Sequence, residues 1–341
     1  MTGHVFRRNH HEIRKFNTIN YAMKRTSFFV VSFFLFTFLC SGRIVNHHHG
    51  RSKGIWTIEW SPNGKWIAVG GDDSTVRFYN GDTYSLKQIH AVKSMVRAVS
   101  WHPNEDLLAI ATNDGVILFQ VETGKTKTIT NLKDGGRGIG WNHNGELLAL
   151  ADGYGVIQLM HKDGRLIRSI PSPDKKSYLS LDWHPTKELM ATGGDDIRIF
   201  DTTGKKLYQV KHRTEETGVL TIDWHPKGLM FASGDYGHEL EAIPTLLQFW
   251  TDTGGLIKTM KGSLLEYRNI RWNNSGTRLA TASDVLRIWS EEGRLLYTGT
   301  PGAELWGLSW SPDGERIITG SYSDGSIKVW TKEAKLIRTL D

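Results

Sequence analysis

Residues 305–321 read LWGLSWSPDGERIITGS, and the same 17-residue pattern occurs seven times in this 341-residue chain. The other copies begin at residues 55, 96, 136, 178, 219 and 267, and all align without a gap. Each copy has a tryptophan at its sixth position: Trp60, Trp101, Trp141, Trp183, Trp224, Trp272 and Trp310. Successive tryptophans are 38 to 48 residues apart, so the chain repeats one structural unit.

Each unit has the pattern of four short strands. Apolar residues alternate with period two in the first strand, where Ile58 shares a face with Trp60. A Ser-Pro, His-Pro or Asn turn leads to a second apolar run, and runs such as IKVWT (327–331) and KLIRTL (335–340) follow. One such sheet cannot bury both of its faces alone, so the units must stack around an axis. The sequence predicts an all-β fold: a seven-bladed β-propeller of four-stranded antiparallel blades over residues 54–341.

These motifs resemble the WD-repeat family. The resemblance rests on WSPDG (310–314), on third strands that end in RIFD, RIWS or KVWT, and on the period, and it covers about residues 54–341. The family's Gly-His pair survives only loosely, at His49, His90 and His212, so its Trp-Ser/Thr-His-Asp tetrad is expected to be missing from most blades. Five turn acids are expected to bond local N–H groups: Asp73, Asp114, Asp196, Asp284 and Asp324. The last blade already has its fourth strand, so either RIVN (43–46) adds a fifth or the ring closes through side chains.

The first 42 residues have the pattern of a leader. A basic pair follows Met23, the probable start, then an apolar run covers residues 28–39 and Cys40-Ser41-Gly42 follows. This order is typical of a secretory signal peptide and is too short for a bilayer-spanning helix. A buried strand, an uncleaved anchor and lipidation at Cys40 are alternatives. Residues 43–53 are expected to be a tail or an extra strand, with His47–His49 solvated. The sequence therefore predicts an exported protein, periplasmic, cell-envelope or secreted, or a membrane-anchored lipoprotein.

Charge and cysteine content exclude several functions. Residues 1–53 carry nine Lys or Arg against one acid, whereas the remainder carries 33 bases against 35 acids. The predicted propeller is thus nearly neutral, which argues against nucleic-acid binding. Cys40 is the only cysteine, so the propeller has no disulfide, thiolate zinc site or cysteine nucleophile.

Candidate partner-binding residues occur four positions before each repeat tryptophan. By resemblance to the family, this position opens on the wider, partner-binding face around the channel. It holds Trp56, Arg97, Arg137, Leu179, Leu220, Arg268 and Trp306. Exposed Trp and Arg dominate interface hot spots and suit carboxylates or sugars. In the alternative reading, Trp56 and Trp306 pack on each other and the arginines pair with loop acids.

An insertion interrupts the fifth unit, GDYGHELEAIPTLLQFW at 234–250. The resemblance places this hairpin on the same face, where Tyr236, His238 and Glu239 are candidate partner contacts. A neutral insertion and a divalent-cation site, with Glu241 and Asp235 as further ligands, are the alternatives.

Two other sets favour structure over chemistry. The His-Pro histidines His102, His184 and His225 occupy a slot filled elsewhere by Ser or Asn, which favours turn bonding over metal. Asp182 and Asp223 precede tryptophans in adjacent units, and Arg271 in the next unit predicts an inter-blade ion pair.

The sequence thus predicts a non-enzymatic binding or scaffold protein with no catalytic residue, metal or cofactor. Its expected partner is a protein, with a glycan as a second possibility, no nucleic acid, and membrane contact only through Cys40. One alternative is a propeller hydrolase or lyase with a funnel site. Another is an intracellular WD-repeat scaffold whose start has been assigned wrongly.

Overall fold

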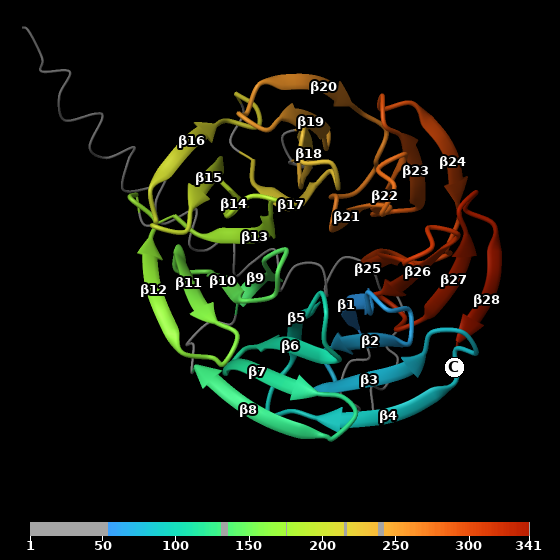
Figure 1. The fold of residues 1–341 in the computed structure, drawn as a ribbon. Helices are drawn as coiled ribbons and strands as arrows, with labels where there is room; N and C mark the ends of the chain where they lie inside the picture. Colours follow the sequence, from blue (N-terminus) through green and yellow to red (C-terminus); the bar gives the residue numbers. More distant parts are fainter. Residues whose placement is uncertain (1–53, 131–135, 175, 215–216, 238–241, 341) are drawn as a thin grey trace, which may run out of the picture. The chain divides into compact units, whose positions relative to one another are not determined.

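The computed structural model describes residues 54–340 apart from 131–135, 175, 215–216 and 238–241. These residues lie within one unit, Arg51–Asp341, and form 28 strands and no helix. Figure 1 shows seven four-stranded antiparallel sheets set around an axis, which confirms the predicted seven-bladed propeller. In the part of the chain described, no helix is long and apolar enough to cross a membrane.

Each blade takes four consecutive strands, from the channel outward. The innermost strands are β1 (Ile55–Trp60), β5 (Val96–Trp101), β9 (Gly136–Trp141), β13 (Tyr178–Trp183), β17 (Val219–Trp224), β21 (Asn269–Trp272) and β25 (Leu305–Trp310). The second strands are β2 (Trp66–Gly71), β6 (Leu107–Thr112), β10 (Leu147–Asp152), β14 (Leu189–Gly194), β18 (Met230–Asp235), β22 (Arg278–Ala282) and β26 (Arg316–Ser321). The third strands are β3 (Thr75–Asn80), β7 (Gly115–Gln120), β11 (Val156–His161), β15 (Ile197–Asp201), β19 (Leu247–Thr251), β23 (Leu286–Ser290) and β27 (Ile327–Thr331). The outermost are β4 (Leu86–Ala91), β8 (Lys125–Thr130), β12 (Leu166–Pro171), β16 (Lys206–Val210), β20 (Leu256–Met260), β24 (Leu295–Gly299) and β28 (Leu336–Leu340).

The hydrophobic core is divided among the seven boundaries between blades. Each of seven buried clusters combines residues of two successive blades, and each contains one repeat tryptophan. In the boundary between blades 1 and 2, for example, Phe78 packs against Trp101 with ring centroids 6.2 Å apart. No blade could bury these faces alone, so stacking supplies the main stabilisation.

The ring closes by packing between blade 7 and blade 1. Blade 7 takes all four strands from β25–β28, and the described residues add no fifth strand to it. Ile55 and Ile58 pack instead against Val329 and its neighbours. The backbone N–H of Trp60 donates to Ser309 Oγ at 3.0 Å across this seam. The RIVN segment, residues 43–46, lies outside the described residues, as does the predicted leader.

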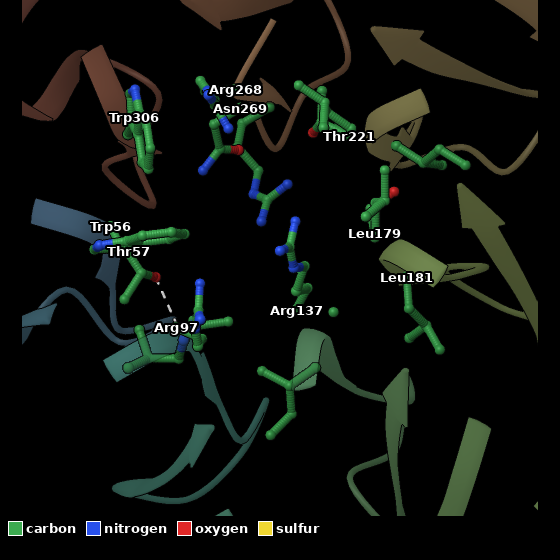
Figure 2. A pocket seen from close by; sticks show the side chains of 18 residues that line it. Trp56, Thr57, Arg97, Arg137, Leu179, Leu181, Thr221, Arg268, Asn269 and Trp306 are labelled. Carbon is green, nitrogen blue, oxygen red and sulfur yellow. Dashed lines mark hydrogen bonds between the residues drawn. The ribbon is translucent and has the colours of Figure 1, made fainter. Parts of the chain in front are cut away.

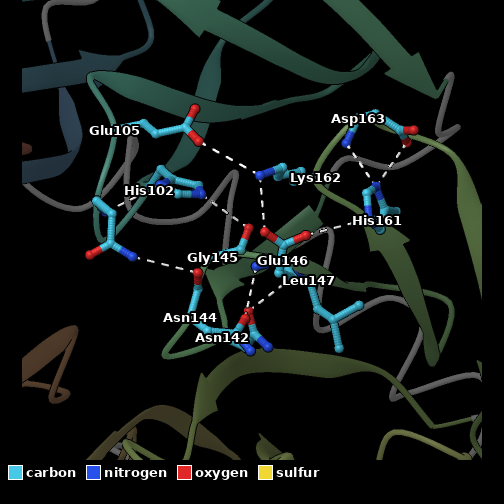
Figure 3. Close-up of polar contacts among 11 residues, drawn as sticks. His102, Glu105, Asn142, Asn144, Gly145, Glu146, Leu147, His161, Lys162 and Asp163 are labelled. Carbon is cyan, nitrogen blue, oxygen red and sulfur yellow. Dashed lines mark hydrogen bonds and ion pairs between the residues drawn. The ribbon is translucent and has the colours of Figure 1, made fainter.

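The turn after each repeat tryptophan has one of two bonding patterns. In four blades, Ser or Asn accepts a backbone N–H across the turn, as when Ser311 Oγ accepts from Arg316 at 2.9 Å. In the His-Pro turns, Nδ1 accepts a nearby N–H, so the proton lies on Nε2. Nε2 of His102 then donates to the Gly145 carbonyl of the next blade at 3.0 Å, as Figure 3 shows. The predicted turn role is confirmed, and the inter-blade bond is an addition to it.

The turn acids only partly follow the prediction. Asp73 and Asp324 accept local backbone N–H groups at 3.0 and 2.9 Å. Asp196 and Asp284 instead pair with Arg198 and Arg287 of the following strands, at 3.4 and 2.7 Å. An arginine two or three residues further along provides a charge that outweighs the local turn bond.

Blade 5 assembles the four residue types of the family's tetrad. Trp250 Nε1 donates to Ser233 Oγ at 2.7 Å, and His212 Nδ1 lies 3.5 Å from Asp235 Oδ2. Burial lowers the pKa of His212 to about 3, so this imidazole is neutral.

Candidate functional site

The seven residues four positions before the repeat tryptophans gather at one mouth of the channel. We call them the mouth ring: Trp56, Arg97, Arg137, Leu179, Leu220, Arg268 and Trp306. All seven line a single cavity of about 140 Å³. Figure 2 labels all of them except Leu220 and shows the side chains that line this opening. The structure therefore brings together the five ring residues predicted as partner contacts.

A repeated backbone irregularity positions the ring. In six blades the ring residue is the extra residue of a β-bulge: Ile55 pairs with Gly71 and Thr57 with Gly70, which leaves Trp56 unpaired in the ladder. In blades 2, 3, 4, 5 and 7 the same register shift leaves the ring residue without a partner in the pairing of the first and second strands. In blade 6, Arg268 comes directly before β21. Bulges re-aim a side chain and are over-represented beside functional sites. The sequence alignment shows the slot but gives no sign of the bulge.

Two adjacent indoles in the ring are flanked by arginines, one on each side. The guanidinium of Arg97 lies 4.6 Å from the Trp56 ring, and that of Arg268 lies 3.9 Å from the Trp306 ring. The two indoles meet edge to face at 4.7 Å. Tyr322 stacks on Trp306 at 3.9 Å. This contiguous stack fixes both arginines by cation–π attraction.

Acids outside the stack hold the indoles in place. Trp56 Nε1 donates to Asp72 at 2.7 Å and Trp306 Nε1 donates to Glu304 at 2.5 Å. Arg268 pairs with Glu266. Trp306 is therefore only 8% exposed, so the prediction of an exposed Trp306 is wrong. It is buried because Arg268 and Tyr322 lie against its two sides, as the alternative reading anticipated in part.

A layer of charge lies deeper in the channel, in the slot directly before the repeat tryptophan. Asp223 pairs with Arg271 at 3.4 Å, which confirms the predicted inter-blade ion pair. Asp182 has a different partner, since it accepts the backbone N–H of Trp224 at 2.6 Å. Glu59 accepts that of Trp101 at 3.2 Å. Ser309 does the same at the closing seam, so this slot links successive blades. Sequence analysis missed Glu59 and Ser309 because the backbone N–H groups that donate to them lie one blade away.

Burial perturbs these carboxyls strongly. Burial raises the pKa of Glu59 to about 8 and that of Asp182 to about 6, although Arg271 opposes both shifts. The pKa of Asp223 is raised as well, for the same reason. Arg271 itself faces the channel lumen with 40% of its side chain exposed. Its guanidinium interacts electrostatically with all three carboxyls, which raises the pKa of Arg271 although burial opposes that shift.

The insertion in blade 5 is only partly described. His238 and Glu239, two predicted partner contacts, and Glu241 lie outside the described residues. Tyr236 lies against Gly218, since a Cβ built there would fall 2.5 Å from the tyrosine ring and 3.4 Å from Leu179. Tyr236 does not line the mouth cavity.

The base of the insertion is held by a carboxylate. Asp235 is fully buried and accepts the N–H of Leu246 at 2.7 Å. It also pairs with Arg213 at 2.9 Å and accepts from Thr217 at 3.3 Å. The sequence makes Asp235 a candidate cation ligand in one alternative; these bonds give it a structural role in closing the loop.

Comparisons with known proteins agree with this architecture. The family model described as the WDR19 first beta-propeller matches residues 56–224, and the WD domain, G-beta repeat model matches residues 293–331. The chain is 34% identical over 79 residues to the ribosome biogenesis protein bop1 of Danio rerio, which is 23% of this chain and 10% of that protein. It is 22% identical over 304 residues to the meiotic fizzy-related protein 1 of Schizosaccharomyces pombe, which is 85% of this chain and 60% of that protein. The chain thus spans about a tenth of the first relative and less than two thirds of the second.

These relatives overturn the predicted location. They are named for ribosome biogenesis and meiosis, processes that take place inside cells. The prediction of an exported or lipoprotein form, made from residues 23–42, is therefore wrong. An apolar run of that length resembles a signal peptide by composition, whatever its actual role. The leader and Cys40 lie outside the described residues.

Proposed function

We propose, from the premise that this chain is a WD-repeat propeller, that it is an intracellular non-enzymatic scaffold whose mouth ring binds a segment of a partner protein. One observation carries the proposal: six bulges in the same register direct ring residues into one cavity. Bulges that re-aim side chains are over-represented beside functional sites, so their repetition around one cavity supports a binding role for the ring.

The deeper channel supports binding rather than catalysis. A propeller hydrolase or lyase would need acids that are available to a substrate. Glu59 and Asp182 bond backbone N–H groups of the next blade, and Asp223 bonds both the N–H of Trp272, at 2.6 Å, and Arg271. These carboxyls therefore join neighbouring blades. The relatives' names point to two different processes, so only an intracellular setting is taken from them.

Affinity purification with chemical cross-linking tests the proposal. The bait is the full chain in its native cells, either wild type or with Arg97→Gln and Arg137→Gln together. Trp306 is left unchanged because it is buried. The control is Arg165→Gln, an exposed arginine in the β11–β12 turn. This turn follows His161, the last residue of β11, which pairs with Leu147 at the start of β10. We expect the double variant to lose a partner that cross-links near the ring, whereas the control retains it. Retention of every partner by the double variant would contradict the proposal.

A further inference from the structure

The mouth ring has two chemically different arcs. Blades 6, 7, 1, 2 and 3 contribute arginines and tryptophans, whereas blades 4 and 5 contribute Leu179 and Leu220. Figure 2 shows Arg97, Arg137 and Arg268 on one part of the opening and Leu179 with Leu181 on another. A ligand that fills this mouth therefore meets cations on one side and aliphatic surface on the other.

The cavity wall itself carries only positive charge. Its lining includes Arg97, Arg137, Arg268 and Arg271 and no Asp or Glu. The nearby acids lie behind the stack, where they bond indole N–H groups or Arg268. A guanidinium keeps its donors in its own plane when it stacks on an indole face, so a carboxylate can approach edge-on and bond two of them. The wall is therefore complementary to a carboxylate.

The arginine below the ring already has carboxyl neighbours, and the mouth cavity is small. Glu59, Asp182 and Asp223 surround Arg271 directly beneath the ring. The predicted propeller has no basic excess to attract a nucleic acid. A cavity of about 140 Å³ admits a side chain rather than a folded surface. One carboxylate with an aliphatic neighbour fits these limits.

We propose that the mouth ring binds an extended peptide segment in which an Asp or Glu lies within two residues of a Leu, Ile or Val. The carboxylate bonds Arg97 and Arg137, and the aliphatic side chain packs on Leu179 and Leu220. This inference rests on the proposed function, because it names the chemistry of the segment that the scaffold captures.

Selection from a random octapeptide display library tests the inference on the purified full chain. We expect enrichment of sequences with an acid next to an aliphatic residue. The leading peptide is then synthesised with a fluorescein label, together with a copy that has Gln or Asn in place of the acid, and both are titrated by fluorescence anisotropy. Loss of one charge-assisted bond is expected to weaken binding by about tenfold or more.

The protein variants separate the two arcs. Arg137→Gln should weaken the acidic peptide by about tenfold and leave the neutral copy unaffected. Leu179→Ser should weaken both peptides by a similar factor, because it removes only aliphatic contact. Arg165→Gln should change neither. Circular dichroism and thermal unfolding of each variant show whether the fold is retained, and Arg137 is exposed, so its replacement leaves the core intact.

The following results would overturn the inference. Enriched peptides without acids would do so, as would equal affinity for the acidic and neutral peptides. The inference would also be overturned if no peptide were enriched and a fluorescent dT12 oligonucleotide bound to the wild type but not to Arg137→Gln. If partner capture depends on the ring but the cross-linked segment has no acid, the scaffold function stands and this inference fails. If the arginine double variant retains every partner, both fail.

Discussion

The backbone N–H of Trp224 donates to Oδ2 of Asp182 at 2.6 Å, so the repeat tryptophan of blade 5 is tied to the residue before the tryptophan of blade 4. Asp223 holds Trp272 in the same way at 2.6 Å. The indole N–H groups extend this pattern, since Trp183 Nε1 donates to the Gly140 carbonyl at 2.8 Å. Neighbouring blades are therefore joined by directional bonds as well as by apolar packing.

The closing seam depends on one such bond. Ser309→Ala removes the acceptor of the buried Trp60 N–H and should lower the free energy of unfolding by about 1–3 kcal/mol. Urea denaturation followed by far-UV circular dichroism measures this. Ser323→Ala, at an exposed turn, should change the value by less than about 0.5 kcal/mol. Equal stability of the two variants would show that packing alone closes the ring.

The Glu59 carboxyl should make the protein less stable as the pH rises. Its pKa is about 8 in the folded chain against 4.5 for an ordinary Glu, so the folded state retains the proton longer than the unfolded state. Its contribution therefore falls between pH 4.5 and 8. Glu59→Gln keeps an acceptor for Trp101 but does not titrate. The stability of wild type relative to this variant should decrease across that window, and a flat difference would contradict it.

His184 should have the opposite pH dependence. Its Nε2 donates to the Gly228 carbonyl at 3.0 Å and its Nδ1 accepts from Thr186 at 3.1 Å, which requires a neutral ring. Burial lowers its pKa below 6.5, so the folded state binds fewer protons and stability is lost as the pH falls below 6.5. His184→Asn, the residue of this slot in blade 3, should cost about 1–3 kcal/mol at pH 8. Unfolding at pH 5 should show a smaller difference from wild type.

Asp235 should be the most sensitive residue at the base of the insertion. Asp235→Ala removes the acceptor of Leu246 and the carboxylate partner of Arg213, both buried. Removing one member of a buried ion pair costs about 3–5 kcal/mol. Asp82→Ala, an exposed acid in the β3–β4 turn, is the control and should cost less than about 0.5 kcal/mol. Equal unfolding midpoints for the two variants would contradict this role.

Two glycines of β9 should differ in their tolerance of alanine. A Cβ on Gly138 would lie 2.4 Å from the Leu181 backbone nitrogen, whereas on Gly140 its nearest contact is 3.2 Å, to Trp183. Backbone cannot yield as a side chain does, so Gly138→Ala should cost about 1–3 kcal/mol through overpacking. Gly140→Ala should cost less. Thermal unfolding compares the pair, and the reverse order would show that blades 3 and 4 approach each other differently.

The sequence was sufficient for the fold because the blade pattern is local. Alternation around Ile58 and Trp60 and the turns after each tryptophan specify strands without knowledge of neighbours. The repeat alignment also grouped Arg97 and Arg137 in one slot, and the resemblance to the WD-repeat family placed that slot at the channel mouth. It could not show that Trp306 is buried, because Tyr322 and Arg268 reach it only in three dimensions. Nor could it show that Ser309 serves Trp60, since these residues meet only when the ring closes.

The bulges separate what the mouth ring recognises from what keeps the propeller folded. A bulged residue has no cross-strand partner in its ladder, so its identity is not fixed by sheet pairing. This one chain already places Trp, Arg and Leu at the bulged position of different blades. The bulged positions that are not buried, such as Arg97 and Arg137, can therefore change without redesign of the blades. Substitutions at these positions would therefore change which ligand the propeller binds, while the blades keep their structure.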